Sequence, residues 1–173
     1  YPGAVIMITA GASGDINPVY GPNNNFDDIK AIGQELAEEV LRVNDRMDTY
    51  TMKGIKATQE TILAAGKKTS GSRMPNVSLE EGPDVEIRIS AMQIGPVLLA
   101  GISGELMTGI GLEIKENSPY KHTFIYTHCN GNSGYLCTDE AYVEGGYEPM
   151  VAKTMPGTEQ RINEAVSHMI YEF

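Results

Sequence analysis

Apolar residues recur along the chain with two periods, and each period predicts a different kind of element. Three short and almost continuous apolar runs indicate buried strands: residues 4–9, 97–102 and 123–127. Two further segments alternate between apolar and polar positions, which is typical of strands with one face in solvent: residues 52–64 and 85–92. The turn residues Gly95 and Pro96 stand between two of these strands and predict a hairpin.

Helical spacing, with apolar residues three and four positions apart, occurs in three segments: residues 26–47, 103–117 and 158–170. Asn25 or the run Phe26-Asp27-Asp28 provides a capped, acidic start for the first segment, and Thr158 caps the last. Residues 66–83 have no period and predict a long surface loop. Strands and helices alternate, so the expected fold class is α/β, with a sheet of parallel and antiparallel strands packed by helices.

The length of the chain fits one domain or part of one. Its 173 residues are enough to bury roughly 70% of the unfolded surface. The sequence starts at Tyr1, without Met, three residues before an apolar run that has the character of a central strand. Parallel strands normally lie inside a sheet with other elements before them. We therefore expect residues 1–173 to be the C-terminal part of a larger domain whose N-terminal half is not present.

Charge and hydropathy exclude two classes of partner. The formal net charge is −10, and the 13 Lys and Arg residues are scattered along the chain, so a phosphate backbone is repelled on average and no nucleic acid is expected. No apolar run approaches the ~20 residues that span a bilayer, so no transmembrane segment is predicted.

Two cysteines, Cys129 and Cys137, lie eight positions apart in one predicted loop. Free thiols are the favoured interpretation, because one pair of cysteines does not establish an oxidising compartment, and a disulfide is the alternative. Their spacing is not a usual zinc spacing.

Polar loops that contain glycine follow the three apolar strands: residues 11–18, 103–105 and 128–135. In open α/β sheets ligands gather outside the carboxyl ends of the strands, so we expect these loops to converge. Glu105 comes directly after a buried strand, a position that suits a metal ligand or a general base. The alternative is an ordinary acid in the first turn of a helix, where the helix dipole stabilises it.

The first loop contains the sequence GASGD, which could hold an anion on its backbone amides. It matches neither the dinucleotide-binding nor the Walker pattern, and no Lys follows its second Gly. Gly14 and Asp15 are the predicted substrate-binding residues of this loop. The alternative for Asp15 and Asn17 is a turn formed through their own side chains.

Two tyrosines, Tyr135 and Tyr147, bracket residues 138–142, which predict a helix start with a buried aromatic residue. The chain has three histidines, and among them His128 alone lies at the carboxyl end of a predicted strand. No pair of them has the spacing of a zinc site. We therefore do not expect this chain to build a typical zinc site without further ligands.

Several of these segments together resemble a known family. The run GISGE at residues 101–105, the segment HTFIYTHCNGNSGYLCTDEAYVEGGYE, the tail MPGTEQRINEAVSHMI and the opening GASGDINP resemble the neutral/alkaline non-lysosomal ceramidase family. The resemblance runs from about Gly11 to the end. It corresponds to the later part of that family's catalytic domain, without its earlier half and without the C-terminal immunoglobulin-like domain.

The resemblance implies a zinc-dependent amidohydrolase that cleaves ceramide, or a related lipid or acyl amide, into an amine and a fatty acid. Family members hold zinc with two histidines, a glutamate and a tyrosine, and the last two match Glu105 and Tyr135. A further tyrosine near the scissile amide matches Tyr147. Both zinc histidines lie upstream of the first loop in the family, so they would belong to the missing N-terminal half. The resemblance also implies a secreted or periplasmic protein.

One position departs from the family pattern. The nucleophilic serine of the family stands directly before the proline of the first loop, where this chain has Asn17. A side-chain amide is not a nucleophile and cannot form the usual acyl-enzyme. Either a zinc-activated water attacks the amide, with Asn17 holding the water or polarising the carbonyl, or the chain is an inactive relative that binds a ligand in the same cleft. An anion- or nucleotide-binding module built on residues 11–15 is the third hypothesis.

Overall fold

A computed structural model of the chain describes residues 2–18, 25–49, 51–69 and 77–173. These residues form two compact units. Unit 1 comprises Tyr1–Ile16 and Lys53–Phe173, and unit 2 comprises Asn17–Met52. Unit 1 contains the sheet, the helices that cover it and most of the residues with candidate chemistry.

The main sheet of unit 1 has four strands in the order β1-β2-β3-β5. They are β1 (Ile55–Lys67), β2 (Glu81–Ile94), β3 (Val97–Ile102) and β5 (His122–Tyr126). The β1-β2 and β2-β3 pairs are antiparallel, whereas β3 and β5 are parallel. The expected mixed α/β sheet is therefore confirmed. The predicted hairpin is also confirmed, because Ile94 pairs with Val97 across a turn in which Gly95 has a positive φ.

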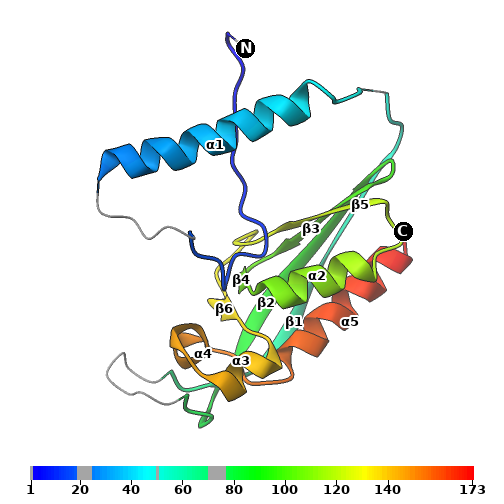
Figure 1. The fold of residues 1–173 in the computed structure, drawn as a ribbon. Helices are drawn as coiled ribbons and strands as arrows, with labels where there is room; N and C mark the ends of the chain where they lie inside the picture. Colours follow the sequence, from blue (N-terminus) through cyan, green and yellow to red (C-terminus); the bar gives the residue numbers. More distant parts are fainter. Residues whose placement is uncertain (1, 19–24, 50, 70–76) are drawn as a thin grey trace. The chain divides into compact units, whose positions relative to one another are not determined.

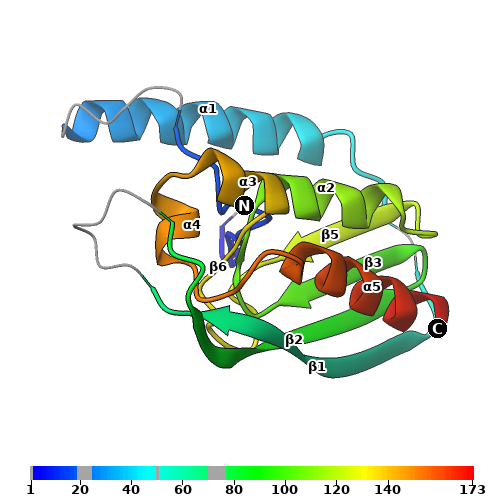
Figure 2. The same ribbon diagram turned by 90° about the horizontal axis from the view of Figure 1, so that it is seen from below.

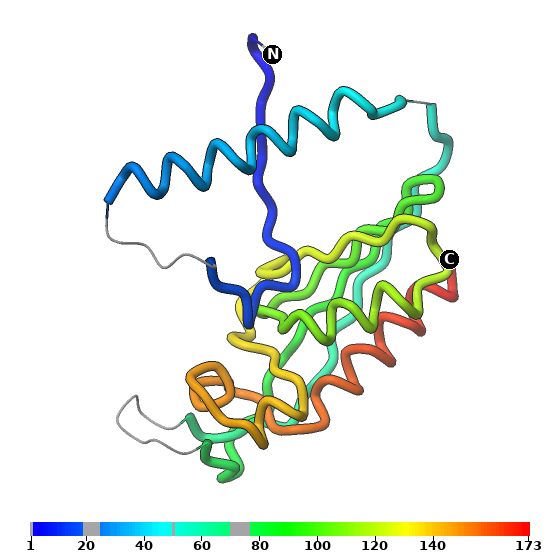
Figure 3. The backbone as a smooth tube through the Cα atoms, viewed as in Figure 1, coloured from blue at the N-terminus to red at the C-terminus, as the bar shows by residue number. Residues whose placement is uncertain are grey.

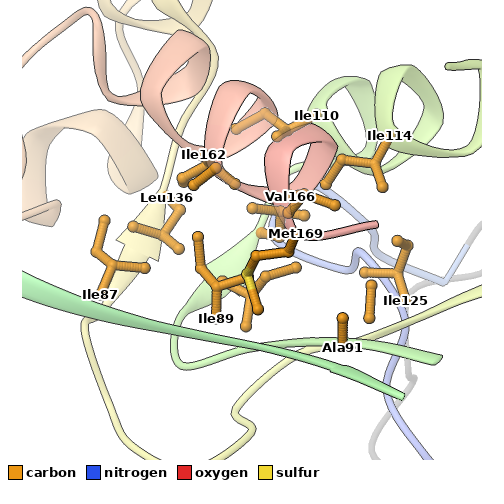
Figure 4. Close-up of a cluster of buried hydrophobic side chains, with 14 of the residues drawn as sticks. Ile87, Ile89, Ala91, Ile110, Ile114, Ile125, Leu136, Ile162, Val166 and Met169 are labelled. Atoms are coloured by element: carbon orange, nitrogen blue, oxygen red, sulfur yellow. The ribbon is translucent and has the colours of Figure 1, made fainter. Parts of the chain in front are cut away.

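Two helices, α2 (Thr108–Glu116) and α5 (Thr158–Tyr171), cover one face of this sheet (Figures 1 and 2). The alternating pattern of β2 places Ile87 and Ile89 on the covered face, and both are fully buried. They meet Ile162 and Val166, which lie four positions apart on one face of α5 (Figure 4). Full burial of one such side chain contributes ~1.5–3 kcal/mol, so this contact between sheet and helix stabilises unit 1 substantially.

The predicted loop at residues 66–83 is shorter than expected. Strand β1 continues to Lys67 and β2 begins at Glu81, so residues 66, 67 and 81–83 belong to the sheet. The two strands come together at a bulge next to Gly66, where a Cβ would lie only 1.7 Å from the Pro83 carbonyl oxygen. Glycine permits this approach, and the sequence shows it as an aperiodic stretch because a bulge interrupts the alternation. Residues 70–76 of the predicted loop lie outside the described residues.

The prediction of a buried strand at residues 4–9 is wrong. This segment of unit 1 is not a strand and runs as an extended chain (Figure 3). Its apolar side chains are exposed, Val5 at 88%. Its contact with β5 begins only after the run, where the Thr127 amide donates to the Ala10 carbonyl oxygen at 3.1 Å and the Thr127 hydroxyl to that of Gly11 at 2.9 Å. An apolar run becomes a strand only where a neighbouring strand supplies hydrogen-bond partners, and no strand of the described residues pairs with this one.

Unit 2 contains helix α1 (Phe26–Asn44), which confirms the first predicted helix with an end three residues earlier than expected. The predicted cap at Asn25 is confirmed, because its side-chain oxygen accepts a hydrogen bond from the Asp28 amide at 2.8 Å. The apolar positions of α1 lie at helical spacing, but no residue of the helix is buried. No helix in the described part of the chain is long and apolar enough to cross a membrane.

Candidate functional site

The loops that follow β3 and β5 are joined by backbone hydrogen bonds. The Glu105 amide donates to the Gly134 carbonyl oxygen at 2.8 Å, and the His128 amide donates to that of Gly104 at 3.1 Å. The first loop joins them through the Gly14 amide, which donates to the Leu106 carbonyl oxygen at 2.8 Å. The convergence expected from the sequence is therefore confirmed for residues 11–16, 103–106 and 128–135.

Glu105 and Tyr135 lie side by side on a second, two-stranded parallel sheet. Strand β4 (Glu105–Leu106) pairs with β6 (Tyr135–Leu136), with Glu105 in register with Tyr135 and Leu106 with Leu136. Leu106 and Leu136 are fully buried in the core, whereas Glu105 and Tyr135 remain partly exposed. Because successive side chains of a strand alternate between faces, the carboxylate and the phenol project together from the face opposite the core.

This geometry corrects one prediction. Glu105 does not lie in the first turn of a helix, because α2 begins at Thr108 and Glu105 belongs to β4. A strand of two residues has no detectable period, so the sequence pattern merged it with the helix that follows. The interpretation of Glu105 as an acid stabilised by the helix dipole therefore no longer applies.

His128 lies beside Glu105. Its Nε2 is 3.9 Å from Oε2 of Glu105, and about half of the imidazole is exposed. Its backbone has a φ of 54°, which is unusual for a residue other than glycine, and Asn130 shares this feature with a φ of 61°. Strained backbone of this kind costs of order 1–3 kcal/mol and tends to occur where side-chain placement matters.

Tyr147 completes the group. It is the first residue of helix α4 (Tyr147–Val151), and its ring packs edge-on against that of Tyr135, with ring centroids 6.2 Å apart and an interplanar angle of 82°. Partial burial raises the pKa of the Tyr135 phenol above its ordinary value, and the negative charges of Glu105 and Glu148 raise it further. The phenol is therefore neutral near pH 7 in the absence of a nearby cation.

Gly14 and Asp15 hold the junction between β4 and α2. A Cβ on Gly14 would lie 3.0 Å from backbone atoms of Glu105, Leu106 and Met107, so the close approach favours glycine. Oδ1 of Asp15 accepts hydrogen bonds from the amide and the hydroxyl of Thr108, both at 2.7 Å. Asp15 thus caps α2 from a distant part of the chain, since the N-cap residue Met107 offers no side-chain acceptor. Their role in substrate binding stays a prediction.

Asn17 is the first residue of unit 2 and follows Ile16 of unit 1 directly in sequence. Its side chain is exposed. The catalytic role that the sequence predicts for it stays a prediction.

The segment between the two tyrosines forms helix α3 (Asp139–Glu144), whose N-cap Thr138 accepts from the Ala141 amide. Tyr142 is the buried aromatic residue that the sequence predicts, and its hydroxyl donates to the Thr154 carbonyl oxygen at 2.7 Å. Burial raises the pKa of Tyr142, because the ionised phenol would lose its hydration.

Both cysteines are free, as favoured from the sequence. Cys137 is buried in the interior, which raises its thiol pKa to about 12. Cys129 is half-buried, and a Cβ on Gly101 would lie 2.6 Å from its Sγ. Of the two thiols, that of Cys137 is a poor nucleophile at neutral pH, because its raised pKa keeps it protonated.

The possible metal donors at this site are the Glu105 carboxylate, the Tyr135 phenol and the His128 imidazole. Among the described residues, no group of three or more His, Cys, Asp and Glu side chains could hold a metal ion. Oxygen and imidazole nitrogen are both donors that zinc accepts, and zinc normally takes four. The donor set therefore fits part of a zinc site.

Sequence reasoning missed a pocket of about 710 Å³ elsewhere in unit 1, which is lined by Lys67, Arg88 and Lys153 among others. Its cationic residues are distributed along the sequence from β1 to the segment after α4, so no local motif reveals them. The pairing of β1 with β2, and the segment after α4 that bonds to β1 through the Lys67 amide and the Lys153 carbonyl oxygen, bring them together.

No family model and no curated protein sequence match this chain. Its structure is similar to the crystal structure of neutral ceramidase from Pseudomonas aeruginosa, with a TM-score of 0.68 and 15% sequence identity over 90% of this chain. The similarity covers 34% of that protein, so the chain spans about a third of its length. A ceramidase complexed with C2 is 21% identical over 49% of this chain and 14% of its own, with a TM-score of 0.46. The resemblance drawn from the sequence is thus confirmed for the fold.

Proposed function

We propose that this chain forms part of a zinc-dependent hydrolase that cleaves an amide bond of ceramide or of a related lipid or acyl substrate. The observation that carries the proposal is the register pairing of Glu105 with Tyr135, because it joins a carboxylate and a phenol on one accessible face. The fold that the chain shares with a neutral ceramidase supports the same reaction class.

Glu105 and Tyr135 would hold the zinc ion, and the remaining ligands would come from the part of the ceramidase fold that this chain does not span. When bound, the ion supplies Lewis-acid polarisation of the scissile carbonyl group. Without a bound metal, the pKa of the Tyr135 phenol lies above its ordinary value. The phenol is neutral before the cation arrives, so binding of the metal is accompanied by loss of a phenol proton and is favoured by rising pH.

Tyr147 is the proposed donor to the substrate. Its side chain is 57% exposed, and its ring is fixed against Tyr135 by the edge-on contact. A tyrosine hydroxyl placed there can donate a hydrogen bond to the amide oxygen as negative charge develops on it. Asn17 is proposed to hold the attacking water or to polarise the carbonyl, since its amide offers both a donor and an acceptor.

The test is hydrolysis of a ceramide by the full-length protein with zinc. Tyr147→Phe removes one hydroxyl and keeps the ring contact, so we expect kcat to fall about 10²-fold or more while zinc content is unchanged. Tyr171→Phe is the matched control, because Tyr171 is the last residue of α5 and its hydroxyl donates to the carbonyl oxygen of Asn117, the C-cap of α2. Equal activity of the two variants would contradict the role of Tyr147.

A second candidate function is a binding protein without catalysis, and the residue at position 17 favours it. This protein would take zinc and a lipid amide but would release no fatty acid. Asn17→Ser separates the two candidates, because it restores the nucleophile that the family pattern has at this position. Activity that appears only in Asn17→Ser would support the binding protein, whereas activity in the natural chain would support the hydrolase.

The anion- or nucleotide-binding module has less support. The Gly14 amide already donates to Leu106, and Oδ1 of Asp15 is occupied by Thr108. Two polar groups of the first loop are thereby used inside the fold.

A further inference from the structure

The pocket in unit 1 is lined by more cationic than anionic side chains, which is unusual in this acidic protein. Its volume of about 710 Å³ lies within the range of small-molecule sites. Six charged residues line it: Lys67, Lys68, Arg88, Lys153, Asp84 and Glu86. Four cations therefore accompany two carboxylates, although the whole chain carries a net charge of −10. An excess of positive charge in one concavity of an acidic protein attracts anions locally.

Lys67 is the most unusual of these cations because it is only 3% exposed. Its Nζ donates to the Met150 carbonyl oxygen at 3.3 Å, and no described carboxylate forms an ion pair with it. Burial lowers its pKa, which reflects the free energy that the charged form loses away from water. An anion in the pocket would offset that loss.

Lys153 and Arg88 have N–H groups that are available to donate hydrogen bonds to an anion. The Lys153 ammonium makes no hydrogen bond or ion pair with any residue that the structure describes, and its aliphatic stem lies 3.9 Å from where a Cβ of Gly134 would be. The Arg88 guanidinium donates from Nη1 to the Asn130 carbonyl oxygen at 3.2 Å, which leaves further N–H groups of its fork. Lys68 differs from these residues, because it is paired with Glu80.

The floor of the pocket is fixed by a closed set of hydrogen bonds. The hydroxyls of Ser103 and Ser133 lie 2.7 Å apart, Ser133 donates to the Glu86 carbonyl oxygen, and the Arg88 amide donates to Ser103. Both serines are buried. The Arg88 backbone is thereby fixed, and its guanidinium is restrained by the hydrogen bond to the Asn130 carbonyl oxygen. A preorganised cation binds an anion at a lower cost in conformational entropy than a flexible one.

We propose that this pocket binds a phosphate-type oxyanion, held by Arg88 and Lys153 next to the buried charge of Lys67. A planar guanidinium suits the paired oxygens of such a group, and two ammonium groups complete the charge. The site is separate from Glu105, Tyr135 and Tyr147, and none of its lining residues belongs to the glycine-containing loop at residues 11–18. The same chemistry is offered by free phosphate and by the phosphate headgroup of a lipid.

The experiment measures the affinity of the full-length protein for inorganic phosphate by calorimetry at constant ionic strength. We expect Lys153→Gln and Arg88→Gln each to raise the dissociation constant about tenfold or more, since each removes a charge-assisted hydrogen bond. Lys121→Gln is the matched control. It removes the same charge from an exposed residue outside the pocket, and we expect the dissociation constant to stay unchanged.

A second arm identifies the source of the oxyanion. Flotation with phosphatidylcholine vesicles, with and without phosphatidic acid, tests the lipid headgroup. Binding that Lys153→Gln weakens and Lys121→Gln leaves unchanged supports the proposal, whether it is observed for free phosphate or for the vesicles. The proposal is overturned if neither probe binds, if acetate at equal ionic strength binds as tightly as phosphate, or if the three variants behave alike.

Discussion

Glu105 and Tyr135 are register partners on two parallel strands of two residues each, and their neighbours Leu106 and Leu136 anchor the same pair in the core. The alternation of side chains in a strand means that the buried leucines determine where the carboxylate and the phenol project. The candidate site is therefore positioned by core packing, and its geometry depends on the stability of unit 1.

The pairing predicts energetic coupling in metal binding. We expect Glu105→Gln and Tyr135→Phe each to weaken zinc binding by about tenfold or more, ~1.4 kcal/mol, and the double variant to lose less than the sum of the two. The measurement is zinc competition with a chromophoric chelator on the full-length protein. The double variant Glu116→Gln/Tyr171→Phe, which changes the same residue types in other parts of unit 1, is the control. Strictly additive losses would contradict the predicted coupling between the two side chains.

Gly104 is a second determinant of this geometry. A Cβ at position 104 would lie 2.4 Å from Cδ1 of Leu136 and 2.8 Å from the Gly134 carbonyl oxygen, so Gly104→Ala pushes β6 away from β4. We expect a loss of ~1–3 kcal/mol in the free energy of unfolding, measured in urea. Gly33→Ala is the control, because position 33 lies inside α1 with nothing within 4 Å of its Cβ. That change should stabilise α1 by ~0.4–1 kcal/mol, and equal effects at the two positions would contradict the packing argument.

Asp15 allows a test between capping and substrate binding. Asp15→Ala removes the acceptor for two hydrogen bonds from Thr108, so we expect the free energy of unfolding to fall by ~0.5–2 kcal/mol. Asp15→Asn keeps an acceptor oxygen and should retain most of the stability. The control is Asp48→Ala, which removes an exposed carboxylate outside any helix or strand. A rise in KM for Asp15→Ala without loss of stability would instead favour the substrate-binding role.

The sequence predicted those elements whose pattern is long enough to have a period. The β2-β3 hairpin, α1 and the start of α3 at Thr138 all follow from alternation, helical spacing or a cap. The apolar spacing predicts a helix at Glu105 because a two-residue strand carries no period. The apolar composition of residues 4–9 predicts a strand, but composition does not reveal whether a pairing partner exists. The pocket around Lys67 was missed because its cations meet only through the register of β1 with β2 and the loops beside them.

Ionisation of Tyr142 lowers the free energy of unfolding at alkaline pH. Burial raises the pKa of its phenol in the folded state above the unfolded value of about 10. Between these two pKa values the folded state therefore binds more protons than the unfolded state. The contribution of Tyr142 to stability is complete below about pH 10 and declines as the pH rises further. Tyr142→Phe removes this dependence.

We expect the free energy of unfolding of Tyr142→Phe to be ~0.5–1.5 kcal/mol lower near pH 7, because the hydrogen bond to Thr154 is lost, and to fall less steeply above pH 10. Denaturation in urea over that pH range is the measurement, with Tyr171→Phe as the control for an exposed tyrosine. Parallel pH curves for the natural chain and Tyr142→Phe would count against a raised pKa.

Lys67 affects the pH dependence of stability in the opposite direction from Tyr142. A variant at this position tests whether the buried charge destabilises the fold. Because burial lowers its pKa, the unfolded state binds more protons between the folded and unfolded pKa values, and stability rises with pH across that window. Lys67→Met keeps a side chain of similar length without the charge, so we expect the free energy of unfolding at pH 7 in phosphate-free buffer to rise, on the order of 1 kcal/mol. Saturating phosphate should stabilise the natural chain more than Lys67→Met. The same measurement on Lys56→Met, at an exposed position of β1, should show no such gain at pH 7. A Lys67→Met protein that is less stable than the natural chain in phosphate-free buffer would mean that the bond to the Met150 carbonyl oxygen outweighs the cost of the buried charge.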